Sequence, residues 1–206
     1  MNYYNNSKKH YSHYQEFPLE HITHIDNLVN ILKYGLLSHT IAFKNGLTQV
    51  DISEQDINLN RKFIKDKIYY KSLHEYAPLF FNALNPMLYK RKELIDKLCV
   101  LRFNRSLISQ IGVIFTDGNA AHSNTKFYQH ENDLIKLDWY CIYETIYWNS
   151  IEDGKRIRMA EVLVPDSVDI KYLYEIVVFS DATKLEVENL ISNSININVI
   201  LTEFKI

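Results

Sequence analysis

The sequence contains little glycine, proline or cysteine. Among its 206 residues there are 5 glycines, 4 prolines and 2 cysteines. So few glycines and prolines argue against a disordered or linker-rich chain. Cys99 and Cys141 lack the spacing of metal ligands, so we expect both to be small buried hydrophobic side chains in a reducing compartment.

Long apolar runs are also missing. No run approaches the roughly 20 residues that cross a bilayer, and the first residues lack the basic-then-apolar pattern of a signal peptide. We therefore expect a cytoplasmic protein without membrane contact. The polar residues 1–16 predict a flexible N-terminal tail, and residues 17–206 predict a single domain.

The formal net charge of −2 hides an uneven distribution of charge. Residues 44–105 contain twelve Lys and Arg against seven Asp and Glu, a net of +5. Residues 166–206 contain three against seven, a net of −4. A basic middle suits a face that meets a polyanion, although solvated surface charge explains the same numbers.

The order of predicted elements indicates the α+β class. A short strand at 21–25 precedes a helix that begins near Asp26 and ends at Gly35. Another helix is expected to begin near Ser53. The second half alternates predicted strands and helices: strands at 98–103, 112–115, 160–164, 175–179 and 197–201, and helices at 104–110, 132–137 and 183–192. This order lacks a regular β-α-β repeat and favours a mainly antiparallel or split sheet.

The stretch from Lys155 to Pro165 combines a basic loop with a short apolar strand that carries one carboxylate. In an extended strand Glu161 and Leu163 share one face, and the residues between them point to the other. A glutamate next to Lys155, Arg156 and Arg158 would lie where an anionic substrate is attracted. The alternative is an exposed glutamate on the solvent face of a half-buried strand.

Two histidines near the N-terminus invite a metal interpretation that their spacing does not support. His21 and His24 are three residues apart, so on a strand they face opposite sides and cannot easily bind one ion. His21 and Thr23, by contrast, share a face and could hydrogen-bond one ligand together. We expect no metal site.

Cations and aromatic residues are interleaved between residues 61 and 92. Five cations fall within residues 61–71, and an aromatic tract follows at 74–89. Grooves for single-stranded nucleic acid combine these residue types, because cations follow the phosphates and rings stack on the bases. A solvated helix face beside an aromatic core would show the same pattern.

Five segments, in order, resemble the DarT family of toxins. They are His21-Ile-Thr23-His24 with Asn27 and Gly35-Leu36; Leu73 to Asn82 running into Asn85-Pro86-Met87-Leu88-Tyr89; Phe115-Thr116-Asp117-Gly118-Asn119-Ala120; Leu137-Asp138-Trp139; and Arg158-Met159-Ala160-Glu161-Val162-Leu163-Val164. They span roughly residues 17 to 180. Each segment alone is a weak signal, and five in register are specific.

The resemblance implies an ADP-ribosyltransferase-like split β-sheet with short flanking helices and a central cleft for NAD. Family members transfer ADP-ribose from NAD to a base of single-stranded DNA, and an antitoxin ADP-ribosyl hydrolase reverses the reaction. The resemblance therefore implies NAD as co-substrate, single-stranded DNA and a cognate antitoxin as partners, and a toxin that acts as a monomer.

The resemblance also assigns roles to individual residues. It implies that Glu161 and Arg61 are catalytic. It implies that NAD is bound by His21, Thr23, Asn27, Gly35, Leu36, Arg61 and Phe80. We expect DNA to contact Met87, Asn119, Lys155, Arg156 and Arg158.

The target base and the acceptor class remain open at this point. Family branches modify thymidine or guanosine, and the Gly118-Asn119-Ala120 and Met159-Ala160-Glu161 sequences slightly favour guanosine. An ADP-ribosyltransferase acting on RNA or protein is the second interpretation. A nucleic-acid-binding module without catalysis is the third, and the presence of Glu161 argues against it.

Overall fold

The computed structural model describes residues 16–47, 50, 52, 60–191 and 197–202. The predicted tail, apart from Glu16, and the helix expected near Ser53 lie outside these residues. Near the N-terminal end of the described residues, the buried Phe17 ring packs edge-on against Phe81 and also packs against Trp139.

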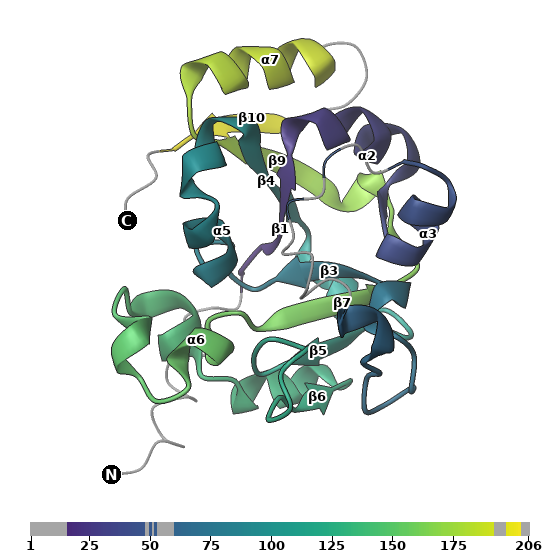
Figure 1. Ribbon diagram of the computed structural model, residues 1–206, viewed down its shortest axis with the longest axis vertical. Helices are drawn as coiled ribbons and strands as arrows, with labels where there is room; N and C mark the ends of the chain where they lie inside the picture. Colours follow the sequence, from purple (N-terminus) through teal and green to yellow (C-terminus); the bar gives the residue numbers. More distant parts are fainter. Residues whose placement is uncertain (1–15, 48–49, 51, 53–59, 192–196, 203–206) are drawn as a thin grey trace.

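An eight-stranded sheet forms the centre of the molecule (Figure 1), in the spatial order β10-β9-β4-β1-β3-β7-β5-β6. Only β10 and β9 pair in parallel, and the other pairings in this sheet are antiparallel. The strands are β1 Leu19–His24, β3 Tyr76–Phe80, β4 Leu98–Phe103, β5 Ile114–Thr116, β6 Phe127–Tyr128, β7 Glu161–Pro165, β9 Leu173–Val178 and β10 Asn198–Leu201. A second, two-stranded sheet pairs β2 Leu36–Leu37 with β8 Ser167–Val168.

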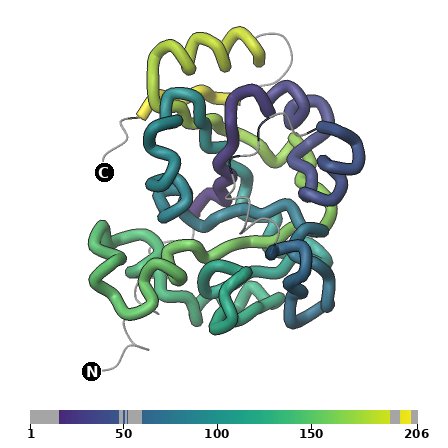
Figure 2. The backbone as a smooth tube through the Cα atoms, in the orientation of Figure 1, coloured from purple at the N-terminus to yellow at the C-terminus, as the bar shows by residue number. Residues whose placement is uncertain are grey.

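Short helices surround the sheet. The α-helices are α2 Leu28–Tyr34, α3 His39–Lys44, α5 Pro86–Lys90, α6 Gly154–Ile157 and α7 Asp181–Ile191. Turns of 3₁₀ helix cover Ile25–Asn27, Leu73–Glu75, Lys92–Lys97, Arg105–Ser109, Glu131–Lys136, Trp148–Ser150 and Ile170–Tyr172, and a π-helix covers Tyr140–Glu144. In Figure 2 the chain passes from α2 and α3 on one side of the central strands to α5 on the other, and α7 lies across the end formed by β9 and β10.

The α+β class and the mainly antiparallel sheet are confirmed. The strand β4 covers the predicted residues, and the other four strands predicted in the second half begin or end within two residues of their predicted limits. The helices predicted at 104–110 and 132–137 are tighter 3₁₀ turns, and the residues around Lys155 form the helix α6 instead of a loop. Both cysteines are buried, as expected.

The sequence patterns did not predict the central strand β3. This strand contains Pro78, which cannot donate a hydrogen bond to a neighbouring strand, and proline normally argues against a central strand. The structure tolerates Pro78 because β3 pairs fully with β7 on one side and with β1 at a single position, Glu20 opposite Phe80, on the other. The sheet is therefore split beside β3, on the side that faces β1.

Candidate functional site

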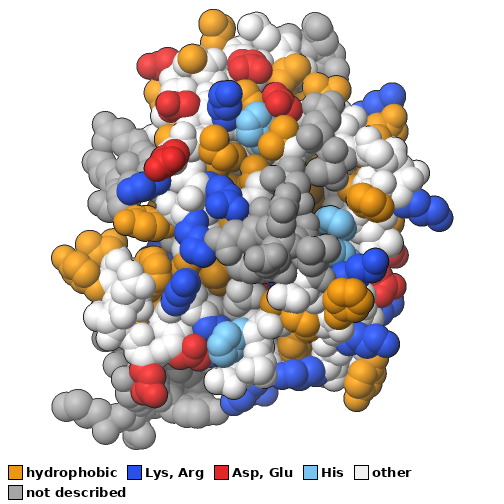
Figure 3. Space-filling model, viewed as in Figure 1, with side chains coloured by type: hydrophobic (Ala, Val, Ile, Leu, Met, Phe, Trp, Pro, Cys, Tyr) orange, Lys and Arg blue, Asp and Glu red, His pale blue; other side chains and the backbone are white. Residues whose placement is uncertain are grey.

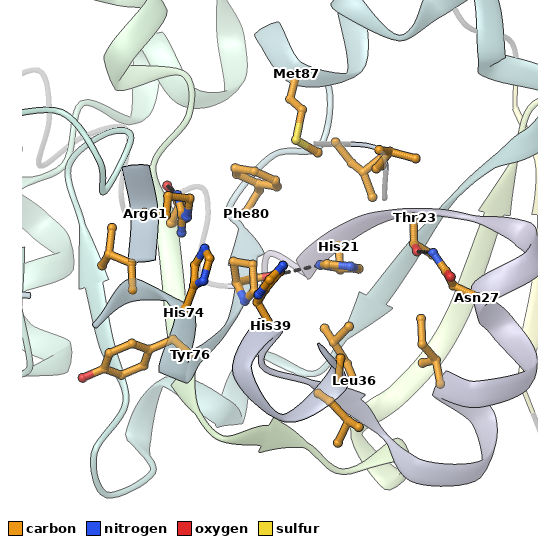
Figure 4. A pocket seen from close by; sticks show the side chains of 18 of the residues that line it. His21, Thr23, Asn27, Leu36, His39, Arg61, His74, Tyr76, Phe80 and Met87 are labelled. Atoms are coloured by element: carbon orange, nitrogen blue, oxygen red, sulfur yellow. Dashed lines mark hydrogen bonds and ion pairs between the residues drawn. The ribbon is translucent and has the colours of Figure 1, made fainter. Parts of the chain in front are cut away.

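The split between β1 and β3 opens into a cavity of about 460 Å³. Beyond the pair of Glu20 and Phe80, β1 pairs only with β4, and β3 only with β7. One side chain bridges the gap: the Nδ1 atom of His21 lies 2.8 Å from the carbonyl oxygen of Pro78. Figure 4 shows this contact within the cavity, with Arg61, Phe80 and Met87 to one side and Thr23 and Asn27 to the other.

His21 and Thr23 face the cavity from β1, as the alternation of the strand predicts. Burial lowers the pKa of His21 below its ordinary value of 6.5, and the hydrogen bond to Pro78 opposes this shift. The imidazole is therefore neutral at pH 7 and donates from Nδ1 to the Pro78 carbonyl. His24 points away from the cavity and its Nδ1 lies 3.3 Å from Asp26, so the two histidines do not share a ligand.

Asn27, Gly35 and Leu36 form the adjoining wall of the cavity. The Asn27 amide donates to the Thr23 hydroxyl and to the Val50 carbonyl, and its oxygen accepts from the Val50 N–H, so it orients Thr23. Gly35 ends α2 with φ +82°, and a Cβ atom there would lie 2.6 Å from the Val168 carbonyl oxygen. Only glycine fits this turn without strain.

Glu161, the first residue of β7, is buried at the base of the cavity with 1% of its surface exposed. Both of its carboxylate oxygens accept hydrogen bonds from Arg61, at 2.9 and 3.2 Å. The Ala120 N–H donates a third, at 2.8 Å. The solvent-facing alternative for this glutamate is therefore excluded, because a buried carboxylate with three donors is an organised group.

The loop after β5 holds Glu161 in place. The Thr116 hydroxyl accepts from the Glu161 N–H at 3.0 Å and donates to the Gly118 carbonyl at 2.6 Å. A Cβ atom at Gly118 would lie 2.9 Å from the Arg156 carbonyl oxygen and 2.3 Å from its guanidinium, so a larger residue there would displace Arg156. Asn119 lines the cavity, and its amide lies 3.8 Å from the sulfur of Met159. The segment from Thr116 to Ala120 thus positions both Glu161 and Asn119.

Phe80, Met87 and Lys155 also line the cavity, so eleven of the thirteen predicted site residues meet there. They come from β1, the 3₁₀ turn Ile25–Asn27, the residue after α2, β2, the helical residues 60–63, β3, α5, the loop after β5, α6 and β7. Long-range strand pairing is what brings together residues as distant in sequence as His21 and Glu161.

Arg156 and Arg158 require a correction, because neither is available as the DNA contact we expected. Arg156 forms ion pairs with Asp117 at 2.8 Å and Asp153 at 2.5 Å and so links α6 to the loop after β5. Arg158 is 5% exposed. Its Nε donates to the Leu84 carbonyl, and its Nη1 lies within hydrogen-bonding distance of three carbonyls in residues 141–145. Both arginines have a structural role, because Nε and Nη1 of each donate to protein acceptors.

Several cavity residues had no predicted role. They include His39, His74, Tyr76, Lys90, Arg91 and Met159. His74 and Tyr76 lie in the aromatic tract that the sequence analysis singled out, but no spacing rule indicated that they face the cavity. The rings of His39 and His74 are 4.1 Å apart between their centroids.

Within the described residues, no three His, Cys, Asp or Glu side chains are grouped to hold a metal ion, so the absence of a metal remains a prediction. No helix in the described part is long and apolar enough to cross a membrane.

Comparison with known proteins identifies the family. Residues 21–204 match the family described as "ssDNA thymidine ADP-ribosyltransferase, DarT". A DNA ADP-ribosyl transferase–DNA ADP-ribosyl glycohydrolase fusion protein of Thermosipho africanus is 33% identical over 187 residues, which cover 88% of this chain and 47% of the fusion. The chain thus spans about half the length of that relative. A DNA ADP-ribosyl transferase of Thermus sp. is 29% identical, covering 82% of this chain and 85% of that one.

Solved structures of DarT proteins agree with this family assignment. The Thermus sp. 2.9 DarT in complex with ADP-ribosylated ssDNA has a TM-score of 0.82 and 26% identity, covering 91% of this chain and 94% of the other. The same protein in complex with NAD⁺ has a TM-score of 0.79. The family description names thymidine, so it gives no support to the slight preference for guanosine. By its sequence match over residues 21–204 and its fold, this chain belongs to the DarT family of NAD-dependent single-stranded-DNA ADP-ribosyltransferases.

Proposed function

We propose that this protein transfers ADP-ribose from NAD to thymidine in single-stranded DNA, as the toxin of a toxin–antitoxin pair. The observation that carries the proposal is the Arg61–Glu161 pair at the base of a cavity opened by the split sheet. The cavity volume of about 460 Å³ suits a cofactor-sized ligand. The neutral His21 and the hydroxyl of Thr23 offer polar contacts to one end of NAD.

Glu161 is proposed to stabilise the transition state. Cleavage of the bond between nicotinamide and ribose leaves positive charge on C1′ and the ring oxygen, as in glycoside hydrolysis. A fixed carboxylate beside that carbon stabilises the charge and costs no reorganisation, because Ala120 and the Thr116 hydroxyl already hold Glu161 in place. The bonding electrons leave with nicotinamide.

Glu161 is also suited to accept the proton that the attacking thymine nitrogen loses when it bonds to C1′. Arg61 cannot take that role, because a guanidinium stays protonated at neutral pH. We assign Arg61 to orienting Glu161 and to binding the negative diphosphate of NAD. Asn119, Met87 and Lys155 lie around the same cavity and are proposed to meet the DNA.

A relative of this chain suggests the identity of the antitoxin partner. The Thermosipho africanus relative joins a DNA ADP-ribosyl transferase to a DNA ADP-ribosyl glycohydrolase in one chain. We propose that a hydrolase of that kind is the cognate antitoxin here, and that the toxin acts as a monomer in the cytoplasm, where it meets DNA and NAD.

Mass spectrometry of nucleosides tests the proposal. Single-stranded DNA, RNA and a protein mixture are incubated separately with the protein and NAD. We expect ADP-ribosylated thymidine from the DNA alone. Modified guanosine would overturn the choice of base, and modification of RNA or protein in place of DNA would overturn the acceptor.

A further inference from the structure

Residues 62–72 form a loop that begins and ends at the wall of the cavity. Arg61 before it and Leu73 after it both line the cavity. The loop carries four lysines and three exposed aromatic side chains: Lys62, Lys65, Lys67 and Lys71, with Phe63 at 78%, Tyr69 at 44% and Tyr70 at 72% exposure. We call this the Lys62–Lys71 surface. Figure 3 shows blue and orange side chains alternating at the lower right of the molecule.

Hydrogen bonds fix the conformation of this loop, although several of its side chains are exposed. The carboxylate of Asp66, 1% exposed, accepts hydrogen bonds from the N–H groups of Ile68, Tyr69 and Lys71 and from the Tyr76 hydroxyl. Two backbone hydrogen bonds also close the loop: the Asp66 N–H donates to the Lys71 carbonyl, and the Leu73 N–H donates to the Ile64 carbonyl. A preformed surface loses little conformational entropy when it binds a partner.

Tyr70 is held in an unfavourable backbone conformation at the tip of this loop. Its φ is +60°, in the left-handed region that a bulky side chain rarely adopts. Its ring is mostly exposed, so packing inside this chain does not compensate for the cost. Backbone strain that intramolecular packing does not explain is a feature of binding sites.

The charge of the surface is positive and not neutralised locally. Residues 62–71 contain four lysines and one acid, Asp66, whose carboxylate is buried and used by the loop itself. Among the described residues, Lys62, Lys65 and Lys71 have no carboxylate partner within 4.0 Å. Lys67 donates to the carbonyls of Ser123 and Thr125, which ties the loop to the segment that carries Asn119.

We propose that the Lys62–Lys71 surface binds the DNA strand next to the target nucleotide, with phosphates on Lys62, Lys65 and Lys71 and bases stacked on Phe63 and Tyr70. The cations and rings lie on one rigid loop that adjoins the cavity, which is the arrangement that single-stranded nucleic acid requires. Arg156 and Arg158, which the sequence suggested for this task, are occupied elsewhere. This proposal rests on the proposed function.

The first test removes the charges. Lys62→Gln/Lys65→Gln/Lys71→Gln is compared with Lys97→Gln/Lys171→Gln/Lys184→Gln, which changes the net charge equally at positions outside the cavity lining and the loop. Binding of a labelled single strand is measured by anisotropy without NAD over a range of salt. We expect the first variant to bind more weakly and to lose up to about 2 units of the log–log salt slope, since each phosphate contact contributes about 0.7.

The second test removes one ring. Tyr70→Asn deletes the aromatic side chain, and asparagine tolerates the left-handed backbone, so the loop is kept. Tyr174→Asn, at an exposed position on β9, is the control. We expect Tyr70→Asn to weaken binding of a long strand about tenfold, which corresponds to the loss of one base–aromatic stack.

Oligonucleotide length separates this proposal from the proposed function. The shortest strand that the wild-type protein modifies is compared with strands extended on the 5′ side or the 3′ side. We expect the variants to lose kcat/KM only on one extended set. Equal losses on short and long strands, or no loss on either, would overturn the proposal. The proposal would also be overturned if the variants bound DNA as the wild type does but no longer bound the antitoxin hydrolase. If the wild-type protein modifies no DNA, the proposed function fails, while the anisotropy measurement still decides whether this surface binds the strand.

Discussion

Arg61 and Glu161, a hundred positions apart in the sequence, face each other through two hydrogen bonds at the base of the cavity. The arginine side chain is 17% exposed and the glutamate side chain 2%. The pair lies where β7 meets β3, directly opposite Phe80. The geometry makes Glu161 a permanently oriented carboxylate, with Arg61 as the partner that faces the substrate space.

Glu161→Gln should abolish transfer and leave the fold intact. Glutamine keeps an oxygen to accept from the Ala120 N–H, but it has no negative charge to stabilise the ribosyl cation. We expect ADP-ribosylation of a single-stranded oligonucleotide to fall by at least about 10²-fold, measured by mass spectrometry. Glu131→Gln, at a surface ion pair, is the control and should stay active. Full activity of Glu161→Gln would remove the glutamate from the mechanism.

Arg158→Ala should destabilise the protein. The buried guanidinium satisfies the carbonyls of Leu84, Ile142 and their neighbours, and its removal leaves these acceptors unpaired. We expect a loss of about 3 kcal/mol, or roughly 10 °C in Tm. Lys155→Ala, at an exposed position on the cavity rim, should leave Tm unchanged and weaken DNA binding. An Arg158→Ala variant with wild-type Tm would show that these hydrogen bonds add nothing.

Stability should fall with acid because of His21. Burial lowers its pKa in the folded state, while the unfolded chain has the ordinary value of about 6.5. The unfolded state therefore binds the proton more readily, so this contribution is present above pH 6.5 and is lost as the pH falls below it. Between pH 7.5 and 5.5, Tm should fall less in His21→Asn than in the wild type. The exposed His130→Asn should behave as the wild type, and equal slopes for all three would contradict the assignment.

Gly35→Ala should reduce both stability and NAD binding. The added Cβ meets the Val168 carbonyl at 2.6 Å, and the positive φ disfavours any L-residue. We expect a loss of about 2 kcal/mol and a raised KM for NAD, because Gly35 lines the cavity. Gly46→Ala, also at positive φ but with open space around it, separates backbone strain from the clash. The two variants should differ in Tm and in KM.

Elements with local signals could be predicted from the sequence alone. β-Branched and aromatic residues predicted β4, Gly35 predicted the end of α2, and alternation on β1 placed His21 and Thr23 on one face. Asp26, expected to cap that helix, lies instead in the 3₁₀ turn before it. The five motif segments indicated the family, and they contain nine of the predicted site residues that line the cavity. These features depend on a residue and its near neighbours in the chain, and near neighbours can be read from the sequence.

Which charged side chains are available to a ligand depended on contacts between distant segments of the chain. In the sequence, Arg156 and Arg158 look like Lys155, three cations before a strand. In the structure one meets two carboxylates and one is buried among carbonyls, because the folding of residues 82–85, 117 and 141–145 brings those acceptors to them. The strand β3 escaped prediction for the same kind of reason: Pro78 is tolerated only because the sheet splits beside it. Desolvation and hydrogen-bond partners come from residues far away in the chain, and they decide whether a charge supports the fold or binds a ligand.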